Sequence, residues 1–258
     1  MCRVISIASL KGGVGKTTTC INLGTALAKQ GKKVLLVDSD PQGHLTLGLG
    51  FNKKQSHTLK TALEHIIEED EFDIYEMILH HRENVDVLPA NKTLGVMNTY
   101  LATVLDGEQV LKEVVTMVKE VYDYVLIDCG PSLGLLSINA LTASSSVLIP
   151  LELARYAADG LVEMLRTVQV VRAKYNSELK VEGILYNKDE PRHNNTKLYK
   201  KMINMGYADH LYIFKNSIPR TVRIEETANQ GVSILETEPN SEYASCYLNL
   251  ALEVAAHE

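Results

Sequence analysis

Residues 11–18 read KGGVGKTT, a glycine-rich stretch that holds two lysines and two threonines. It follows VISIAS (4–9), a run of apolar and β-branched residues that is typical of a buried strand. It precedes TTTCINLGTALAKQ (17–30), where apolar residues recur at helical spacing until Gly31 supplies a stop signal. A strand, a glycine-rich turn and a helix in this order indicate the first unit of a parallel α/β sheet.

The rest of the chain repeats this alternation. Further strands are predicted at 32–38, 85–90, 122–128, 146–152, 180–187 and 210–214, and further helices at 58–68, 108–120, 134–142, 158–173, 195–205 and 241–256. The pattern predicts an α/β fold with a mostly parallel, twisted sheet and helices on both faces. The more polar segment 50–84 has no regular pattern to fix its elements. Ligands of such sheets bind at the carboxyl ends of strands, where the loops after 4–9, 32–38 and 122–128 are expected to meet.

The composition is that of a globular protein. The chain has 258 residues, 45% hydrophobic and 22% charged, which suits one large domain over 1–258 with its own core. A net charge of −6 argues against a dedicated nucleic-acid binder but leaves room for a local basic patch. No apolar run reaches the length of a membrane span, no secretion leader is visible, and the four cysteines are scattered. We therefore expect a cytoplasmic protein with reduced thiols.

The glycine-rich stretch has the features of a phosphate-binding loop. Its three glycines free the backbone to curl, so that N–H groups and the N-terminus of the next helix face an anion. Lys16 is placed to reach the β- and γ-phosphates of a nucleotide, and the hydroxyl of Thr17 is placed to bind Mg²⁺. A glycine-rich turn without a ligand is the alternative, and the Lys-Thr pair in register argues against it.

Three aspartates follow predicted strands at the same edge of the sheet. Asp38 and Asp40 lie in DSDPQG (38–43), and Asp128 ends the apolar run VLID. A carboxylate here could hold an Mg²⁺-bound water or orient the attacking water in phosphoryl transfer. The competing interpretations are an Asx turn before Pro41 and a cap of the segment that follows Asp128.

The loop departs from the common pattern GxxxxGK[ST], because Leu10 stands at the first glycine and Lys11 adds a second lysine. KGGVGKTT resembles the deviant Walker A motif, KGGxGK[ST], of the ParA/MinD family of ATPases. The resemblance continues, in the family's order and at about its spacing, through VLLVDSDPQG (34–43), YDYVLIDCGPSLGLLSINAL (122–141) and IPRTVRIEE (218–226). It covers nearly the whole chain, and the ParA (Soj-like) branch, which partitions plasmids and chromosomes, fits best.

The resemblance implies a P-loop ATPase that uses ATP and Mg²⁺ with weak intrinsic turnover. The family's extra lysine, matched by Lys11, reaches across a homodimer interface to the ATP of the other subunit and offsets the charge of two facing nucleotides. Asp40 matches the residue that supports hydrolysis, whereas Asp38 is expected to be structural or to lie in the outer shell. Asn187 would bind the base edge, and Pro219 and Thr221 would line the adenine, although each could be an ordinary loop residue.

The expected site residues are therefore the following. Catalytic roles fall to Lys11, Lys16 and Asp40, and metal contacts to Thr17, Asp40 and Asp128. Nucleotide contacts are expected from Lys11, Gly12, Gly13, Val14, Gly15, Lys16, Thr17, Thr18, Asp128, Asn187, Pro219 and Thr221. Relatives often read Asp-x-Pro-Pro where this chain has Asp-Cys-Gly-Pro, so Gly130 is expected to make the switch loop more mobile. An iron–sulfur role for Cys129, by analogy with the related nitrogenase iron protein, lacks a suitable second cysteine.

Basic residues cluster in two later stretches. Arg192, Lys197, Lys200 and Lys201 lie in the first, and Lys215, Arg220 and Arg223 in the second. A solvated charged face is one interpretation. The resemblance of IPRTVR to the family's DNA-contacting loop favours sequence-independent contacts to double-stranded DNA by Arg220, Arg223 and Arg192. Only ten residues precede Lys11, too few for a helix-turn-helix and operator recognition.

The expected partners are a second copy of the chain, non-specific DNA on the nucleoid and a ParB-like centromere-binding protein that stimulates hydrolysis. The strongest alternative is a membrane-cycling ATPase of the MinD or flagellar-positioning type, but the tail 243–258 holds no Lys or Arg, and no membrane contact is expected. A bacterial tyrosine kinase is less consistent, because Tyr243 and Tyr247 are more simply read as packing residues. A metabolic P-loop enzyme such as an amide-forming synthetase would need a substrate pocket that the sequence does not locate.

Overall fold

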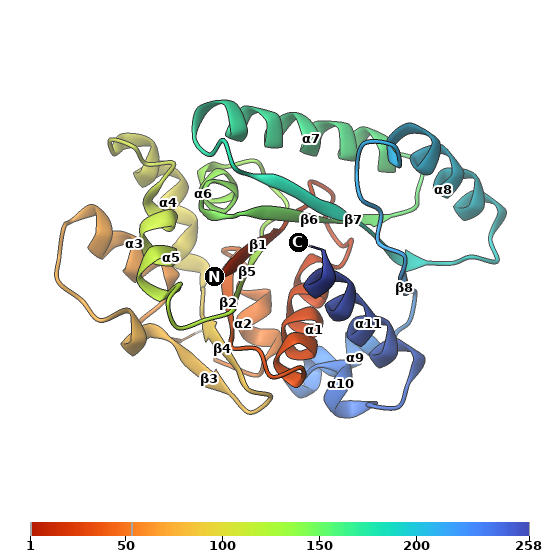
Figure 1. Ribbon diagram of the computed structural model, residues 1–258. Coiled ribbons are helices and arrows are strands. Elements are labelled where there is room, and N and C mark those ends of the chain that lie inside the picture. Colours follow the sequence, from red (N-terminus) through yellow and green to blue (C-terminus); the bar gives the residue numbers. More distant parts are fainter. Residues whose placement is uncertain (1, 53, 258) are drawn as a thin grey trace.

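The computed structural model describes residues 2–52 and 54–257, and in them eight strands form one sheet in the order β3-β4-β2-β5-β1-β6-β7-β8 (Figure 1). The strands are β1 (Arg3–Ile7), β2 (Val34–Ser39), β3 (Leu79–His81), β4 (Val85–Leu88), β5 (Tyr124–Cys129), β6 (Ser146–Glu152), β7 (Lys180–Asp189) and β8 (Ile218–Pro219). The short edge strand β3 runs antiparallel to β4, and the other neighbouring strands pair in parallel. The predicted mostly parallel sheet is confirmed.

Helices cover both faces of the sheet (Figure 1). They are α1 (Lys16–Lys29), α2 (His44–Gly48), α3 (Leu59–Ile67), α4 (Met97–Tyr100), α5 (Val110–Val118), α6 (Leu135–Ala143), α7 (Ala157–Lys174), α8 (Asn194–Tyr207), α9 (Arg223–Gln230), α10 (Ile234–Thr237) and α11 (Glu242–Ala256). Residues of α3, α5, α6 and α7 belong to one buried apolar cluster, and residues of α1, α10 and α11 to the other. Within the described residues, no helix combines the length and apolarity that crossing a bilayer requires.

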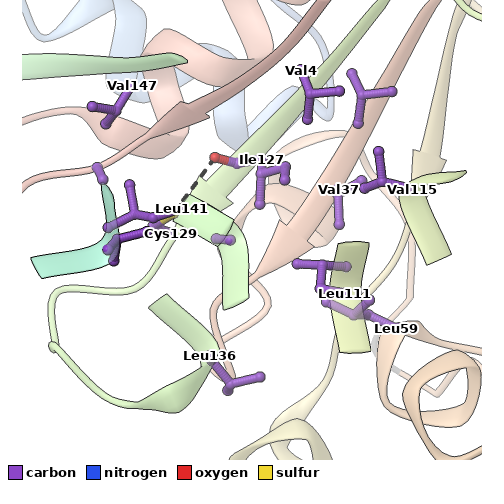
Figure 2. Packing of buried hydrophobic residues seen from close by; sticks show 14 of the residues in the cluster. Val4, Val37, Leu59, Leu111, Val115, Ile127, Cys129, Leu136, Leu141 and Val147 are labelled. Atoms are coloured by element: carbon purple, nitrogen blue, oxygen red, sulfur yellow. Dashed lines mark hydrogen bonds between the residues drawn. The ribbon is translucent and has the colours of Figure 1, made fainter. Parts of the chain in front are cut away.

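The two clusters follow from the two-residue period of the strands. Val37 of β2 and Ile127 of β5 face one cluster, while their neighbours Leu36 and Leu126 face the other. Figure 2 shows the first cluster, in which Leu111 and Val115 of α5 are buried with Val37 and Ile127. Strands that are buried on both faces have almost no polar positions, which explains the continuous apolar runs seen in the sequence.

Most of the predicted elements are confirmed, with small shifts at their ends. The segment 210–214 is the exception, because it forms no strand beyond one bridge between Ile213 and Ile184. Tyr212 and Phe214 lie over Gly183 of β7, where a side-chain carbon would come within 2.7 Å of Phe214. The N–H of Ile184 donates to the carbonyl of Tyr212 at 2.9 Å, and the N–H of Phe214 donates to the carbonyl of Ile184 at 3.0 Å. The pairing extends no further, and β8 takes the sheet edge later in the chain. The short elements β3, β8, α2, α4 and α10 and the helix α9 were not predicted from the sequence.

Candidate active site

The three loops singled out in the sequence meet at one edge of the sheet. Strands β2, β5 and β1 are neighbours, and Asp38 and Asp128 are paired in register at the carboxyl ends of β2 and β5. A cavity of about 680 Å³ opens there. Of the predicted site residues, Gly12, Gly13, Gly15, Lys16, Thr17, Thr18, Asp40, Asn187, Pro219 and Thr221 line it. The topology therefore places most of the candidate residues around a single site.

The glycine-rich loop has the backbone that its sequence predicts. Gly13 and Gly15 have φ angles of 74° and 87°, in the left-handed region that favours glycine. A side-chain carbon at Gly15 would also lie 2.4 Å from the Nδ2 atom of Asn187. Helix α1 begins directly after this residue, so the loop and the helix N-terminus form an anion-binding cradle. Val14 is buried beneath the loop and does not line the cavity.

Lys16 and Thr17 form the polar floor of the cavity, and Asp128 lies buried directly behind Thr17. The Nζ atom of Lys16 donates to the carbonyl of Lys11 at 3.2 Å, and burial lowers the pKa of Lys16, although the charge of Asp128 opposes this. The hydroxyl of Thr17 donates to Oδ2 of Asp128 at 2.7 Å. Burial raises the pKa of Asp128 well above its usual value, and the nearby carboxylate of Asp38 adds to the effect. The charged form of Asp128 is thus disfavoured until a cation or a further hydrogen-bond donor approaches it.

This arrangement fits Mg²⁺. The Oδ1 atom of Asp128 is buried and has no hydrogen-bond partner among residues 2–52 and 54–257, so it is a carboxylate oxygen still able to accept from a cation or its water. In the same part of the chain, no group of three or more His, Cys, Asp or Glu side chains could hold a metal alone. Mg²⁺ characteristically takes one or two protein ligands and completes its shell with phosphate and water.

Asp38 and Asp40 differ in their surroundings. Asp38 is fully buried and accepts hydrogen bonds from the backbone N–H and the hydroxyl of Thr46, at 2.9 and 2.6 Å. Burial raises its pKa to about 6, although these hydrogen bonds oppose the shift. Asp40 lines the cavity, and its Oδ1 accepts from the N–H of Gln42 at 2.9 Å. The Asx-turn interpretation and the hydrolytic interpretation of Asp40 are therefore compatible.

The switch loop after β5 brings Gly130 beside Asp40. A side-chain carbon at Gly130 would lie 3.5 Å from Cγ of Asp40, in ordinary contact, so the glycine leaves one side of this carboxylate uncovered. The neighbouring Cys129 is buried, and burial raises its pKa to about 12. Its thiol donates to the carbonyl of Ile127 at 3.8 Å (Figure 2). Cys129 is therefore a packing residue on the far side of the strand end.

The wall of the cavity beyond the phosphate loop was only partly predicted. Asn187 donates to Thr19 at 3.2 Å and to the carbonyl of Gly15 at 3.5 Å, so in this structure its amide braces the loop. The remaining lining residues were not predicted from the sequence: Ile21, Asn22, Gln42, His44, Leu47, Gly48, Pro131, Lys188, Ile218, Ile224, Thr227, Ala228, Asn229, Val232 and Tyr247. The signal available in the sequence was Gly231, since glycine often ends a helix. In the structure it ends α9 with a φ of 70°.

Comparisons with known proteins agree with this geometry. A family model described as an AAA domain matches residues 2–181. The sporulation initiation inhibitor protein Soj of Bacillus subtilis (strain 168) is 43% identical over 258 residues, which is 100% of both chains. The chain belongs to the ParA/MinD family of P-loop ATPases. The chromosome partitioning protein ParA of Caulobacter vibrioides is 35% identical over 258 residues, covering 99% of this chain and 95% of the relative.

A solved structure also covers the whole chain. Cobyrinic acid a,c-diamide synthase from Mycobacterium smegmatis, with bound ATP analog and magnesium, has a TM-score of 0.86 and 31% identity, covering 100% of this chain and 96% of that one. The family assignment and the Soj-like branch inferred from the motifs are confirmed. The expectation of ATP and Mg²⁺ agrees with the ligands of this relative.

The family's extra lysine lies outside the cavity in this ParA/MinD-family chain. Lys11 is exposed, and its Nζ donates to Oε2 of Glu152 at 2.7 Å. It is not among the residues that line the cavity of its own chain, where Lys16 already occupies the phosphate side. The structure therefore separates the two lysines of the loop into an inner and an outer position.

The basic residues considered for DNA binding are paired with acidic ones. Arg220 contacts Glu152 at 2.7 Å and Glu190 at 3.1 Å, and Arg223 contacts Glu238 at 2.9 Å. Arg192 lies in the exposed turn before α8. The loops of Arg192 and Arg220 are neighbours because β7 and β8 are paired, as the ion pair between Arg220 and Glu190 shows. The two basic stretches are thus brought together, but with carboxylates between them.

Proposed function

We propose that this ParA/MinD-family chain is a DNA partition ATPase whose ATP-bound form is a sandwich dimer. The observation that carries the dimer is the position of Lys11, which is exposed beside the phosphate cavity yet does not line it. A lysine in this place adds nothing to its own site that Lys16 does not supply. It can instead neutralise phosphate charge on a second subunit that faces this edge of the sheet.

Hydrolysis would use the polar floor of the cavity. Lys16 and the loop backbone would hold the phosphates, Thr17 and Asp128 would hold Mg²⁺ with its water, and Asp40 would orient the attacking water. Bound Mg²⁺ would neutralise charge on the phosphates. Phosphoryl transfer relies on positioning and charge neutralisation, and none of these residues is a strong base, so intrinsic turnover is expected to be slow until a ParB-like partner stimulates it.

A separate DNA-binding surface is formed by Arg192, Arg220 and Arg223, which we propose contact DNA phosphates without reading the base sequence. Dimerisation would present this surface twice, and two weak phosphate-binding surfaces on one body bind a long polyanion much more tightly than one. Relatives of this chain carry the names Soj and chromosome partitioning protein ParA, which supports DNA as the surface and the nucleoid as the place.

Two other functions fit the structure less well. A membrane-cycling ATPase would need an apolar helix face for the bilayer. In α11 the apolar residues Ala244, Tyr247, Leu250, Ala251 and Val254 are buried in the core, and Leu252 is the one large apolar side chain of this helix that is more than half exposed. The likeness to a diamide synthase raises amide formation as a second candidate. An amide-forming enzyme that takes its ammonia from glutamine needs a reactive thiolate. Burial instead raises the pKa of all four cysteines, Cys2 to about 11.

The decisive experiment measures binding to non-specific double-stranded DNA without nucleotide, with ADP, with ATP and with a slowly hydrolysed ATP analogue, at two salt concentrations. We expect binding only with the triphosphate, and a steep loss of affinity as salt rises. Lys16→Ala should lose ATP binding, dimerisation and DNA binding together, whereas Arg220→Ala should weaken DNA binding to all sequences and keep ATP binding. Equal DNA affinity for Lys16→Ala and the parent would refute the coupling between nucleotide and DNA.

A further inference from the structure

Glu152 is placed between the nucleotide loop and the proposed DNA surface by the order of the strands. It is the last residue of β6, which lies between β1 and β7 in the sheet. The loop with Lys11 follows β1, and the loop that leads to Glu190 follows β7. In a parallel sheet these loops emerge at the same edge, so the terminal residue of the middle strand faces both.

The side chain of Glu152 holds one cation with each of its oxygens. Its Oε2 accepts from Lys11 at 2.7 Å, and its Oε1 accepts from Arg220 at 2.7 Å. Arg220 reaches Glu190 with its Nε atom at 3.1 Å, so Lys11, Glu152, Arg220 and Glu190 form one chain of alternating charge, here termed the Glu152 cluster.

The charges of this cluster affect one another. Glu152 is only 19% exposed, whereas the cations on either side are about half exposed. Partial burial acts to raise the pKa of Glu152, but the hydrogen bond and charge of Lys11, followed by the charge of Arg220, hold that pKa below its ordinary value. A mostly buried carboxylate between two cations is thus kept ionised, and both cations gain a partner in their own chain.

The geometry points to a role that rests on the proposed function: Glu152 is a positioning residue that holds Lys11 within its own chain until a second, ATP-bound subunit offers a triphosphate in exchange. If Lys11 extends across an interface to a partner's nucleotide, its Nζ moves away from Oε2 of Glu152, which it contacts at 2.7 Å within its own chain. Lys11 must therefore give up this ion pair when the dimer forms, and Glu152 sets a threshold for ATP-driven dimerisation. By the same contact it restrains Arg220.

The expected effect is modest for each subunit and larger for the dimer. A partly exposed ion pair changes an equilibrium by about two- to fivefold. Two subunits release two such pairs when they join, so the factors multiply. Glu152→Gln, which keeps the size of the side chain and removes its charge, should lower the dissociation constant of the nucleotide-bound dimer by about tenfold.

The test uses sedimentation of the full chain with a slowly hydrolysed ATP analogue. Glu190→Gln is the matched control, because it removes the same charge from the same cluster and touches Arg220 but not Lys11. We expect tighter dimerisation for Glu152→Gln and an unchanged dimer for Glu190→Gln. If Glu152 had only a structural role, its replacement would weaken the dimer or leave it unchanged. Tighter dimerisation of the variant therefore indicates that Glu152 holds Lys11 back. ATP affinity measured below the dimerisation range should be the same in all three proteins.

Three outcomes would overturn the inference, and they are separable. Equal or weaker dimerisation of Glu152→Gln, while the parent still dimerises with the analogue, removes the role of Glu152 and leaves the proposed function standing. An equal gain for both variants would show a general effect of negative charge at this edge instead of a hold on Lys11. A parent that stays monomeric with the analogue would refute the proposed ATP dimer, and this inference with it.

Discussion

Gly15 lies where the glycine-rich loop, helix α1 and Asn187 of the cavity wall meet. Gly15→Ala would force a side-chain carbon to within 2.4 Å of Asn187 Nδ2 at a φ of 87°. We expect a loss of about 1–3 kcal/mol in the free energy of unfolding, from strain and the displaced amide. Thermal unfolding without nucleotide measures it. Gly12→Ala is the control, since a carbon there meets no atom within 4 Å, and a similar loss for both variants would contradict the argument.

Asp40 carries the prediction about catalysis. It lines the cavity and is held by the N–H of Gln42, whereas Asp38 is buried and engaged with Thr46. If Asp40 positions the attacking water, Asp40→Ala should keep ATP binding and dimerisation but reduce phosphate release by about a hundredfold. A malachite-green assay at saturating ATP, with sedimentation of the same samples, separates the two effects. Normal phosphate release by this variant would refute the assigned role.

At the scale of elements, helix α11 forms hydrogen bonds with the segment 210–216, which was predicted to contain a strand. Glu253 accepts from the hydroxyl of Tyr212 and the N–H of Lys215, both at 2.7 Å, and from Asn216 at 2.8 Å. Partial burial acts to raise the pKa of Glu253, but these hydrogen bonds hold it below its ordinary value. The segment 210–216 pairs with β7 only around Ile184, and the carboxylate of Glu253 on the neighbouring helix supplies further acceptors that fix its path.

Glu253→Gln tests this tie and its pH dependence. A lowered carboxyl pKa adds stability that is complete above the unfolded-state pKa and disappears as the pH falls through the folded-state pKa. We expect the variant to unfold about 1 kcal/mol more easily at pH 7, with the difference shrinking below about pH 4. Chemical denaturation across this range checks it. Glu163→Gln, at an exposed site on α7, should show no such trend, and a constant difference at all pH values would contradict the prediction.

At the scale of the whole molecule, the turn between β3 and β4 supports the wall of the nucleotide cavity. Glu83 is buried and accepts from the N–H of Ser233 at 2.8 Å and from its hydroxyl, while His81 contacts the carbonyl of Gly231 at 3.1 Å. Asn22 of α1 accepts from the N–H of Ile234 at 2.9 Å. Helix α9, which lines the cavity, ends at this junction of distant segments.

Glu83→Gln should therefore affect both stability and nucleotide affinity, although Glu83 does not line the cavity. We expect a loss of about 1–2 kcal/mol in the free energy of unfolding, since charge-assisted hydrogen bonds to a buried carboxylate become neutral ones. ATP affinity should fall severalfold because α9 is less firmly held. Unfolding and ATP titration of the variant, with exposed Glu71→Gln as the control, measure the two effects. Unchanged ATP affinity in a destabilised Glu83→Gln would show that the junction serves only the fold.

The sequence by itself determined the mostly parallel sheet, the longer helices except α9, and the phosphate end of the site. These depend on local signals, namely apolar periodicity, a glycine-rich turn after a strand, and aspartates at strand ends, and so they can be read within short windows. Only the tertiary structure decided the cavity wall beyond the phosphate loop, the path of 210–214, and the partners of Lys11 and Arg220. Each of these depends on which distant residues the strand order brings together, as Glu152 lies 141 residues from Lys11 and 68 from Arg220. No local sequence pattern predicts these ion pairs, because the charged residues come close together only after the strands have taken their places in the sheet.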